Sequence, residues 1–250
     1  MSRLASRDES RVQVLERAAT AMAEHGYHGM SMRDLAKATG RGLASFYHLF
    51  GSKEDILFEL QLRAFQHLLA SAEAALAEPG EPTLRLHRFV ANHVDHFVEQ
   101  PDVMRVLVQE AAALPRKRRA IIRALKQRYF ALGEDLLAAV VAERGATPGP
   151  IEIERRAYCM FGMLNWIFGW YDPARHGSPR DLARTIVEMT VAGAAGSAPI
   201  PEVALALRAR GERRVGGEFL ARRGAGEDAE DGREVLQRRH HLLDRRHDDV

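Results

Sequence analysis

Hydrophobic residues recur along most of the chain with the three- and four-residue spacing of amphipathic helices. In the first such segment, Val12, Leu15, Ala18 and Met22 lie on one helical face, and Gly26 follows the last turn. Alternation of apolar and polar residues with a period of two, which is typical of strands, hardly occurs. The pattern therefore predicts an all-α protein.

Capping signals set the expected helix boundaries. Ser6, Ser31, Ser52 and Ser178 each precede a carboxylate by three positions, so the serine can accept a backbone N–H while the carboxylate faces the positive end of the helix. Proline opens most of the later segments, which suits the first turn of a helix. These signals predict helices over residues 6–24, 31–39, 43–50, 52–77, 82–100, 101–114, 115–144, 150–171 and 179–195.

The same pattern divides the chain into three parts. Residues 1–53 hold three helices, two of them short, and residues 54–197 hold the longer ones. Residues 198–250 differ, because 201–250 contain 11 arginines, 11 acidic residues and no long apolar stripe. Such a segment buries too little apolar surface to offset its ordering entropy, so we expect a disordered tail.

Composition indicates the cellular setting. With 250 residues, 46% of them hydrophobic, the chain can bury a core, and its single cysteine, Cys159, excludes an internal disulfide. The longest uncharged apolar run covers the 15 residues 157–171, whereas a membrane-spanning helix needs about 20. No secretory signal pattern opens the sequence. We therefore expect a soluble, cytoplasmic protein that does not enter a membrane.

The two short helices near the N-terminus form a candidate DNA-binding unit. The net charge of +2 gives no evidence for a nucleic-acid partner, but residues 31–53 carry a local excess of +3. The two helices meet at Gly40, as in a helix-turn-helix, in which the first helix crosses the phosphate backbone and the second enters the major groove.

The second short helix combines an apolar stripe with a polar rim. Leu43, Phe46 and Phe50 recur at helical spacing and would hold this helix against its neighbours. Tyr47 and His48 carry polar tips that could reach phosphate oxygens at the edge of the groove. Taken singly, each could equally be an ordinary surface residue.

The segment SMRDLAKATGRGLASFYHLFGSKEDIL, residues 31–57, closely resembles the DNA-binding segment of the tetracycline-repressor (TetR) family of transcriptional regulators. The shared motifs are a capped short helix, a glycine, a recognition helix with the spacing aromatic-Tyr-x-x-Phe, and a lysine before an acidic pair. The likeness is specific over about residues 8–58 and is architectural beyond them. It implies a three-helix DNA-binding domain over residues 1–53 followed by a helical ligand-binding and dimerisation domain over residues 54–197.

The resemblance also implies how such a protein works. It implies a homodimer whose last two large helices pair across the twofold axis. The dimer would bind double-stranded DNA at a palindromic operator and repress transcription. A mostly apolar small molecule bound in the helical domain would release it.

The resemblance assigns DNA contacts position by position. Contacts to phosphate fall to Ser31, Tyr47 and Lys53. Contacts at the backbone or groove rim fall to Arg33, Lys37 and His48. Contacts to bases fall to Arg41, Gly42, Leu43, Ala44 and Ser45.

The chain departs from the family pattern at the start of the recognition helix. Positions 42 and 43 are often serine and a polar or basic residue in the family, and here they are Gly42 and Leu43. The change removes a helix N-cap and a hydrogen-bond donor. Readout would then depend on Arg41 at guanine, on Ser45, and on apolar contacts of Leu43 or Ala44 with thymine methyl groups.

The segment AYCMFGMLNWIFGWYDP predicts a helix that is apolar nearly all round and hence buried on every side. Gly162 and Gly169 share a face on which another backbone could approach closely. The last large helix has a comparable strip of small and apolar residues, namely Met189, Ala192, Gly193 and Gly196. We expect these two helices to form the dimer seam; packing within one chain is the alternative.

An effector pocket needs mostly apolar walls with a few polar groups. The candidate lining residues are His93, His96, Phe97, Met104, Met160, Met163, Asn165 and Trp166. For each of them alone, plain core packing is the alternative role.

Three other features suggest alternative chemistry. His93 and His96, with Asp95 and Glu99 nearby, could ligate a metal, but a solvated helix face is the commoner interpretation, so we expect neither a metal nor a cofactor. Cys159 lies in an apolar helix and is expected to be inert. The basic run 116–119 opens a helix, where cations oppose the dipole; it is either a solvated face or a site for an anionic ligand such as a coenzyme A thioester.

No glycine-rich phosphate loop, serine elbow or zinc-protease motif occurs, so we do not expect an enzyme. Two function classes remain. The favoured one is a ligand-responsive, DNA-binding transcriptional repressor. The alternative is a helical enzyme or small-molecule-binding protein without DNA-binding activity, in which the aromatic cluster of residues 46–50 serves only as core.

Overall fold

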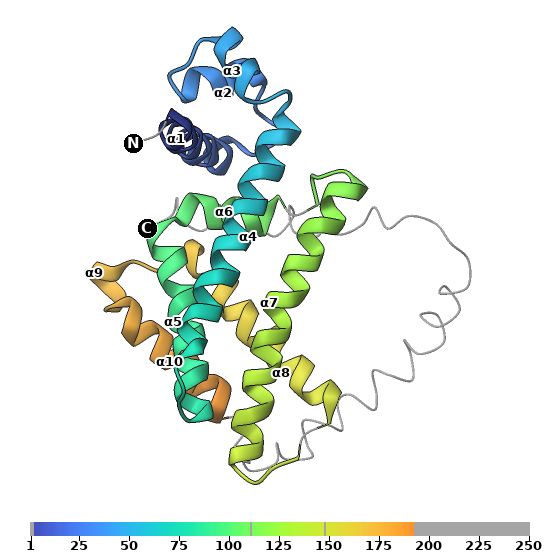
Figure 1. Ribbon diagram of the computed structural model, residues 1–250. Coiled ribbons are helices and arrows are strands. Elements are labelled where there is room, and N and C mark those ends of the chain that lie inside the picture. Colours follow the sequence, from blue (N-terminus) through green and yellow to red (C-terminus); the bar gives the residue numbers. More distant parts are fainter. Residues whose placement is uncertain (1–2, 111, 148, 193–250) are drawn as a thin grey trace, which may run out of the picture. The chain divides into compact units, whose positions relative to one another are not determined.

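A computed structural model describes residues 3–110, 112–147 and 149–192 (Figure 1). All regular secondary structure in these ranges is helical, which confirms the predicted fold class. The expected tail 198–250, together with Gly193 and Gly196, lies outside the described residues. The elements are α1 (Arg3–His25), α2 (Met32–Ala38), α3 (Leu43–Leu49), α4 (Lys53–Ala77), α5 (Pro82–Glu99), α6 (Pro101–Gln109), α7 (Arg116–Glu143), α8 (Pro150–Asn165), η1 (Ile167–Gly169), α9 (Pro173–His176) and α10 (Pro179–Ala192).

Three of the four expected serine caps are confirmed. The Oγ atoms of Ser31, Ser52 and Ser178 accept a hydrogen bond from the backbone N–H three residues later, at 3.2, 3.1 and 3.2 Å. Ser31 forms the full capping box, because the Asp34 carboxylate also accepts from the Ser31 N–H at 2.9 Å. The expectation for Ser6 is wrong, since α1 already begins at Arg3.

The predicted helix over 150–171 is also wrong over its last six residues, 166–171. Helix α8 ends at Asn165, and the chain tightens into a 3₁₀ turn in which the Gly169 N–H donates to the Trp166 carbonyl at 3.0 Å. Nor is α8 buried on every side, because the side chains of Tyr158 and Trp166 are exposed. One face of this apolar helix is therefore left uncovered by the described residues.

Helices α1, α2 and α3 share a core built around the aromatic residues of α3. Phe46 and Phe50 are fully buried and pack against each other with ring centroids 5.6 Å apart. Arg11 of α1 fastens the end of α3, because its Nη1 donates to the Leu49 carbonyl at 2.7 Å and its guanidinium lies 4.4 Å from the Phe50 ring centroid. The same Arg11 bonds Glu59 of α4, with Nε 2.6 Å from Oε1.

Helix α4 belongs to both parts of the fold. Figure 1 shows it leaving the α1–α3 unit and continuing beside α5 and α7. Helix α5 also packs on α7 and α10, and α8 packs on α7 and α10, so the body is a bundle with α5 near its centre. Among the helices of the described ranges, none has the length and apolar content required to cross a bilayer.

Candidate nucleic-acid interface and ligand cavity

The turn between α2 and α3 fixes the direction of the recognition helix. Gly40 has φ +71°, in the left-handed region that favours glycine, and the Arg41 N–H closes α2 by donating to the Ala36 carbonyl at 2.9 Å. Gly42 then serves as the N-cap of α3 in an extended conformation, with no side-chain cap bond. The start of α3 therefore lacks a side-chain cap, as the sequence predicts.

The residues expected to contact DNA lie on the surface of α2, α3 and their turns. Tyr47 is 50% exposed, whereas Phe46 beside it is fully buried, so the helix separates anchoring from contacting residues. Eight of the expected residues are exposed: Ser31, Arg33, Lys37, Gly42, Ala44, Ser45, Tyr47 and His48. Arg41, Leu43 and Lys53 are partly buried.

Two of the expected phosphate-binding residues have other partners in the structure. The Ser31 hydroxyl donates to the Asp34 carboxylate at 2.6 Å, and its hydrogen bonds hold the pKa of that carboxyl below the ordinary value. The Lys53 amine donates to the carbonyls of Tyr27 and Met30, both at 2.8 Å, and lies 4.4 Å from the Tyr27 ring centroid. Lys53 therefore fastens the turn after α1, a role that the sequence did not indicate, and only one N–H of its amine remains for a phosphate.

The corner between α6 and α7 is bonded to the DNA-binding unit. The Glu110 side chain accepts from the Tyr27 N–H, at 3.1 Å from Oε1, and the Glu110 carbonyl accepts from Gln61 Nε2 at 3.1 Å. The Thr20 hydroxyl of α1 donates to Asp102 of α6 at 2.7 Å. These bonds connect the first turn of α6 and the end of that helix to the segments that carry α2 and α3.

The basic run at the start of α7 completes this connection. Arg118 pairs with Glu54 at 2.9 Å and with Asp55, both in the first turn of α4, and its guanidinium lies 5.2 Å from the Phe58 ring centroid. The hydrogen bonds from Ser52 and Arg118 lower the pKa of Asp55. Arg116 and Lys117 are exposed. The cation that the dipole disfavours at Arg118 is thus compensated by the acidic first turn of α4.

The larger cavity of the body has a volume of about 660 Å³, within the range of small-molecule pockets. Helix α7 contributes Lys126, Tyr129, Phe130 and Glu134, which recur at helical spacing on one face. The remaining lining residues come from α4, α5, α6, α7 and α8: Phe65, Leu68, His93, Met104, Leu107, Val108, Gln127, Glu154, Tyr158, Phe161 and Asn165.

His93 is the one histidine of this cavity and is only 2% exposed. Its Nδ1 lies 3.1 Å from the Tyr129 hydroxyl, and its ring stacks on Phe97 with centroids 5.0 Å apart. Burial, with a smaller contribution from His96, lowers the pKa of His93 to about 3, and burial raises the pKa of Tyr129. The imidazole is therefore neutral at physiological pH.

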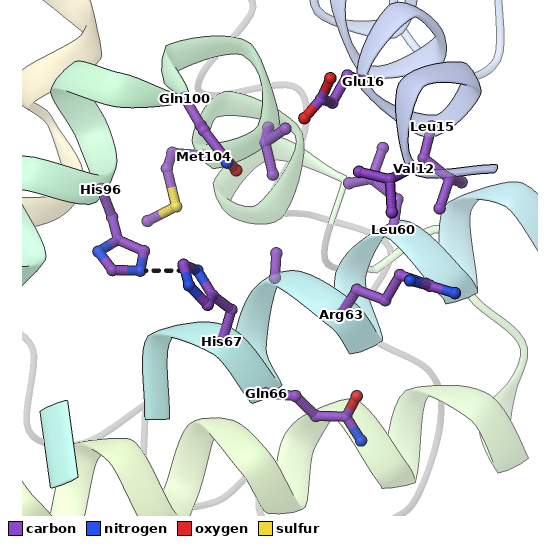
Figure 2. A pocket seen from close by; sticks show the side chains of 12 residues that line it. Val12, Leu15, Glu16, Leu60, Arg63, Gln66, His67, His96, Gln100 and Met104 are labelled. Carbon is purple, nitrogen blue, oxygen red and sulfur yellow. Dashed lines mark hydrogen bonds between the residues drawn. The ribbon is translucent and has the colours of Figure 1, made fainter. Parts of the chain in front are cut away.

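A smaller cavity of about 390 Å³ lies between α1, α4, α5 and α6 (Figure 2). At one end, as Figure 2 shows, His67 of α4 and His96 of α5 point toward each other, with His67 Nδ1 3.2 Å from His96 Nε2. His96 Nδ1 lies 2.9 Å from the Asn92 carbonyl, which can only accept, so Nδ1 carries the proton in this bond. Burial is the main cause that lowers the pKa of His96.

The structure divides the expected pocket residues. His93, Met104 and Asn165 line the larger cavity, and His96 and Met104 line the smaller one. Neither of these two cavities is lined by the remaining four residues: Phe97, Met160, Met163 and Trp166. Phe97 and Met160 are core residues, and Trp166 is 55% exposed.

Sequence reasoning missed the face of α7 that carries Lys126, Tyr129 and Phe130. The helical spacing of these three residues places them on one face, but nothing in the sequence shows which face of α7 meets α5. The paired histidines proved to be separate, because His93 bonds Tyr129 and His96 faces His67. In the described ranges, no group of three or more His, Cys, Asp or Glu side chains is placed to hold a metal ion.

Large apolar side chains are exposed along α8, at its C-cap, and on α10, which packs against α8. They are Ile151, Tyr158, Trp166 and Met189, which are between 55% and 68% exposed. Cys159, which was expected to be inert, is exposed on α8. Gly162 is exposed as well, and a Cβ added there would meet no atom within 4 Å.

A helix-turn-helix unit joined to a helical body with a ligand-sized cavity is the architecture of small-molecule-responsive regulators. Two family models match the chain: bacterial regulatory proteins of the tetR family over residues 14–60, and the tetracyclin repressor-like C-terminal domain over residues 79–194. The TetR family transcriptional regulator PfmR from Thermus thermophilus is 31% identical, with a TM-score of 0.64, and the match covers 72% of this chain and 97% of PfmR. The chain therefore belongs to the TetR family.

Two further relatives differ in how much they match. The HTH-type transcriptional repressor AcnR of Corynebacterium glutamicum is 43% identical over 51 residues, which are 20% of this chain and 27% of AcnR. The match therefore spans about a quarter of the length of that curated relative. AibR, solved in complex with isovaleryl coenzyme A and operator DNA, shares the fold at 24% identity with a TM-score of 0.64, covering 72% of this chain and 97% of AibR.

The buried neutral His93 predicts an acid dependence of stability. Between pH 6.5 and about 3, the unfolded chain binds a proton at this residue that the folded chain does not. The free energy of unfolding therefore decreases as the pH is lowered through this range. The fall should approach about 1.4 kcal/mol per pH unit. Urea denaturation of wild type and His93→Phe at pH 7, 6 and 5 should show that the variant loses this part of the slope. The exposed His25→Gln is the control and should keep the wild-type slope; an unchanged slope in His93→Phe would contradict the assignment.

Proposed function

We propose that the protein is a ligand-responsive, DNA-binding transcriptional repressor that acts as a cytoplasmic homodimer. It binds a palindromic operator through α3 of each subunit and leaves it when a mostly apolar small molecule occupies the body. The observation that carries this proposal is the division of α3 into a buried side, Phe46 and Phe50, and an exposed side, Ala44, Ser45 and Tyr47. A helix held in this way presents its polar side to a major groove, which is wide enough to admit it.

The charges around α3 support the DNA contacts. Arg33 and Lys37 are exposed on α2, and Arg41 lies in the turn, so cations surround the recognition helix on the side of the phosphate backbone. Tyr47 and His48 add hydrogen-bond donors at the groove rim. Base preference is assigned to Arg41, Ser45 and the apolar residues Leu43 and Ala44.

The larger cavity is proposed as the effector site. Phe65 and Leu68 of α4 form part of its wall, and the first turn of the same helix is paired with Arg118. A ligand that shifts α4 against α5 or α7 would therefore move α2 and α3. An acyl-CoA thioester is one effector of suitable chemistry; AibR, which shares the fold, was solved with isovaleryl coenzyme A.

The exposed apolar face of α8 and α10 is proposed as the homodimer seam. Large apolar side chains gather at interfaces, and a glycine allows two backbones to approach closely. Gly162 lies on this face with open space before it. The alternative of a helical enzyme or binding protein without DNA-binding activity gains no support from a regulatory family.

Two substitutions should separate positioning from readout at the DNA. After selection of bound fragments from random DNA, Lys37→Ala should weaken binding to every fragment alike and reduce the slope of log K against log salt by about one. Arg41→Ala should instead lose about 1–3 kcal/mol at one base pair and relax the preference there. Fluorescence anisotropy at several salt concentrations measures both. Arg123→Ala, an exposed arginine of α7, should change neither, and absence of salt-dependent binding in the wild type would refute the proposal.

Gly162→Leu tests the dimer seam without disturbing the single chain. A Cβ at this position meets no atom of the described residues within 4 Å, so the monomer fold should tolerate a larger residue, whereas a closely packed partner helix should not. We expect the dimer dissociation constant to rise at least tenfold, about 1.4 kcal/mol, in sedimentation velocity. Ala74→Leu, an exposed small-to-large change on α4, is the matched control. Equal dimerisation of both variants would exclude this face as the seam.

A further inference from the structure

The larger cavity contains one polar atom that the fold leaves without a partner. His93 lines this cavity, and its Nε2 is buried without a hydrogen-bond partner among the described residues, while Nδ1 is engaged with Tyr129. Leaving such an atom unpaired is unfavourable, so the unused Nε2 of a residue that lines the cavity points to a hydrogen-bonding ligand.

The surroundings of His93 Nε2 are aromatic. The ring of His93 stacks on Phe97 and lies edge-on to Phe161, with centroids 6.1 Å apart. Phe161 can lie this close to α7 because residue 133 is glycine; a Cβ there would come within 3.0 Å of the Phe161 ring. The His93 end of the cavity, here called its floor, therefore carries one unused hydrogen-bonding atom in an apolar cage of aromatic rings.

The charge around this floor decides which head group fits. The side chains whose rings surround His93 are Phe97, Tyr129 and Phe161, none of which is a carboxylate or a cation. A carboxylate placed at Nε2 would hence be buried in an apolar cage without a cation beside it, which is strongly unfavourable. A neutral oxygen has no such penalty. A carbonyl oxygen can accept a hydrogen bond from a neutral imidazole, and a hydroxyl group can accept from it or donate to it.

The ionisable groups of the cavity lie elsewhere along its wall. The Lys126 amine lies 5.2 Å from the Phe65 ring centroid and pairs with no carboxylate in the described part of the chain; burial lowers its pKa. Glu134 and Glu154 line the wall contributed by α7 and α8, and burial followed by the charge of Glu154 raises the pKa of Glu134. Two acids against one lysine make this wall unfavourable for an anionic group, so the phosphates of an acyl-CoA effector would have to lie outside the cavity.

From these contacts we infer that the cavity selects a lipophilic ligand with a neutral hydrogen-bonding oxygen, which bonds His93 Nε2 at the floor, and discriminates against the corresponding carboxylate. This inference rests on the proposed effector role of the cavity and specifies its ligand class. The apolar part of the ligand would lie along Phe65, Leu68 and Phe130.

Three naphthalene probes test the inference on the full-length protein by isothermal titration calorimetry. Wild type should bind 2-naphthol about tenfold more tightly than naphthalene, the effect of one buried hydrogen bond, and at least tenfold more tightly than 2-naphthoate. His93→Phe should bind naphthalene about as well as wild type and lose the preference for 2-naphthol. His93→Gln, which retains a donor and an acceptor, should restore part of that preference.

Several results would overturn the inference, and the wild-type comparison alone is decisive if His93→Phe does not fold. Equal binding of 2-naphthol and naphthalene, binding of none of the three probes, or an unchanged preference in His93→Phe would each do so. Tighter binding of 2-naphthoate would assign the head group to Lys126 instead. Release of bound DNA is measured separately by anisotropy: selective binding of 2-naphthol without any effect on DNA affinity would uphold the His93 contact and contradict the proposed effector function.

Discussion

The constraint on which the structure depends is that one continuous helix, α4, serves two cores. Its first turn is capped by Ser52 and paired with Arg118, and Lys53 holds the carbonyls that follow α1. Farther along, Phe65 and Leu68 form a wall of the larger cavity and His67 faces the smaller one. A helix fixed by its first turn and lining both cavities farther along is suited to transmit a displacement, so our account couples the recognition helix to the cavity through α4.

Much of the DNA-binding unit could be predicted from the sequence, because its signals are local. A serine three residues before a carboxylate fixes a helix start, and Gly40 fixes the turn at a positive φ. The division of α3 into buried phenylalanines and an exposed Tyr47 follows from helical spacing alone. The predicted helix start at Ser6 was wrong because a serine three residues before a carboxylate can also occur inside a helix that has already begun.

The contacts between distant segments could not be predicted in this way. The position of Lys53 indicates a phosphate ligand, yet two carbonyls 23 and 26 residues earlier in the chain take two of its three donors. From the sequence alone, Arg118 is a cation at the unfavourable end of a helix dipole. Its partners are the acids of α4, which lie more than sixty residues earlier in the chain. The cavity depends likewise on which face of α7 meets α5, and burial of Tyr129 against His93 settles that only in three dimensions.

The most direct test of the coupling through α4 is a distance between the two DNA-binding units of the dimer. A spin label on Ala38→Cys, at the exposed end of α2 in a Cys159→Ser background, reports this distance by double electron–electron resonance. Recognition helices that read half-sites one DNA turn apart must be spaced by about 34 Å. The account predicts that saturating 2-naphthol moves the label-to-label distance away from that of the DNA-bound dimer. An unchanged distance distribution, with the probe shown by calorimetry to be bound, would contradict it.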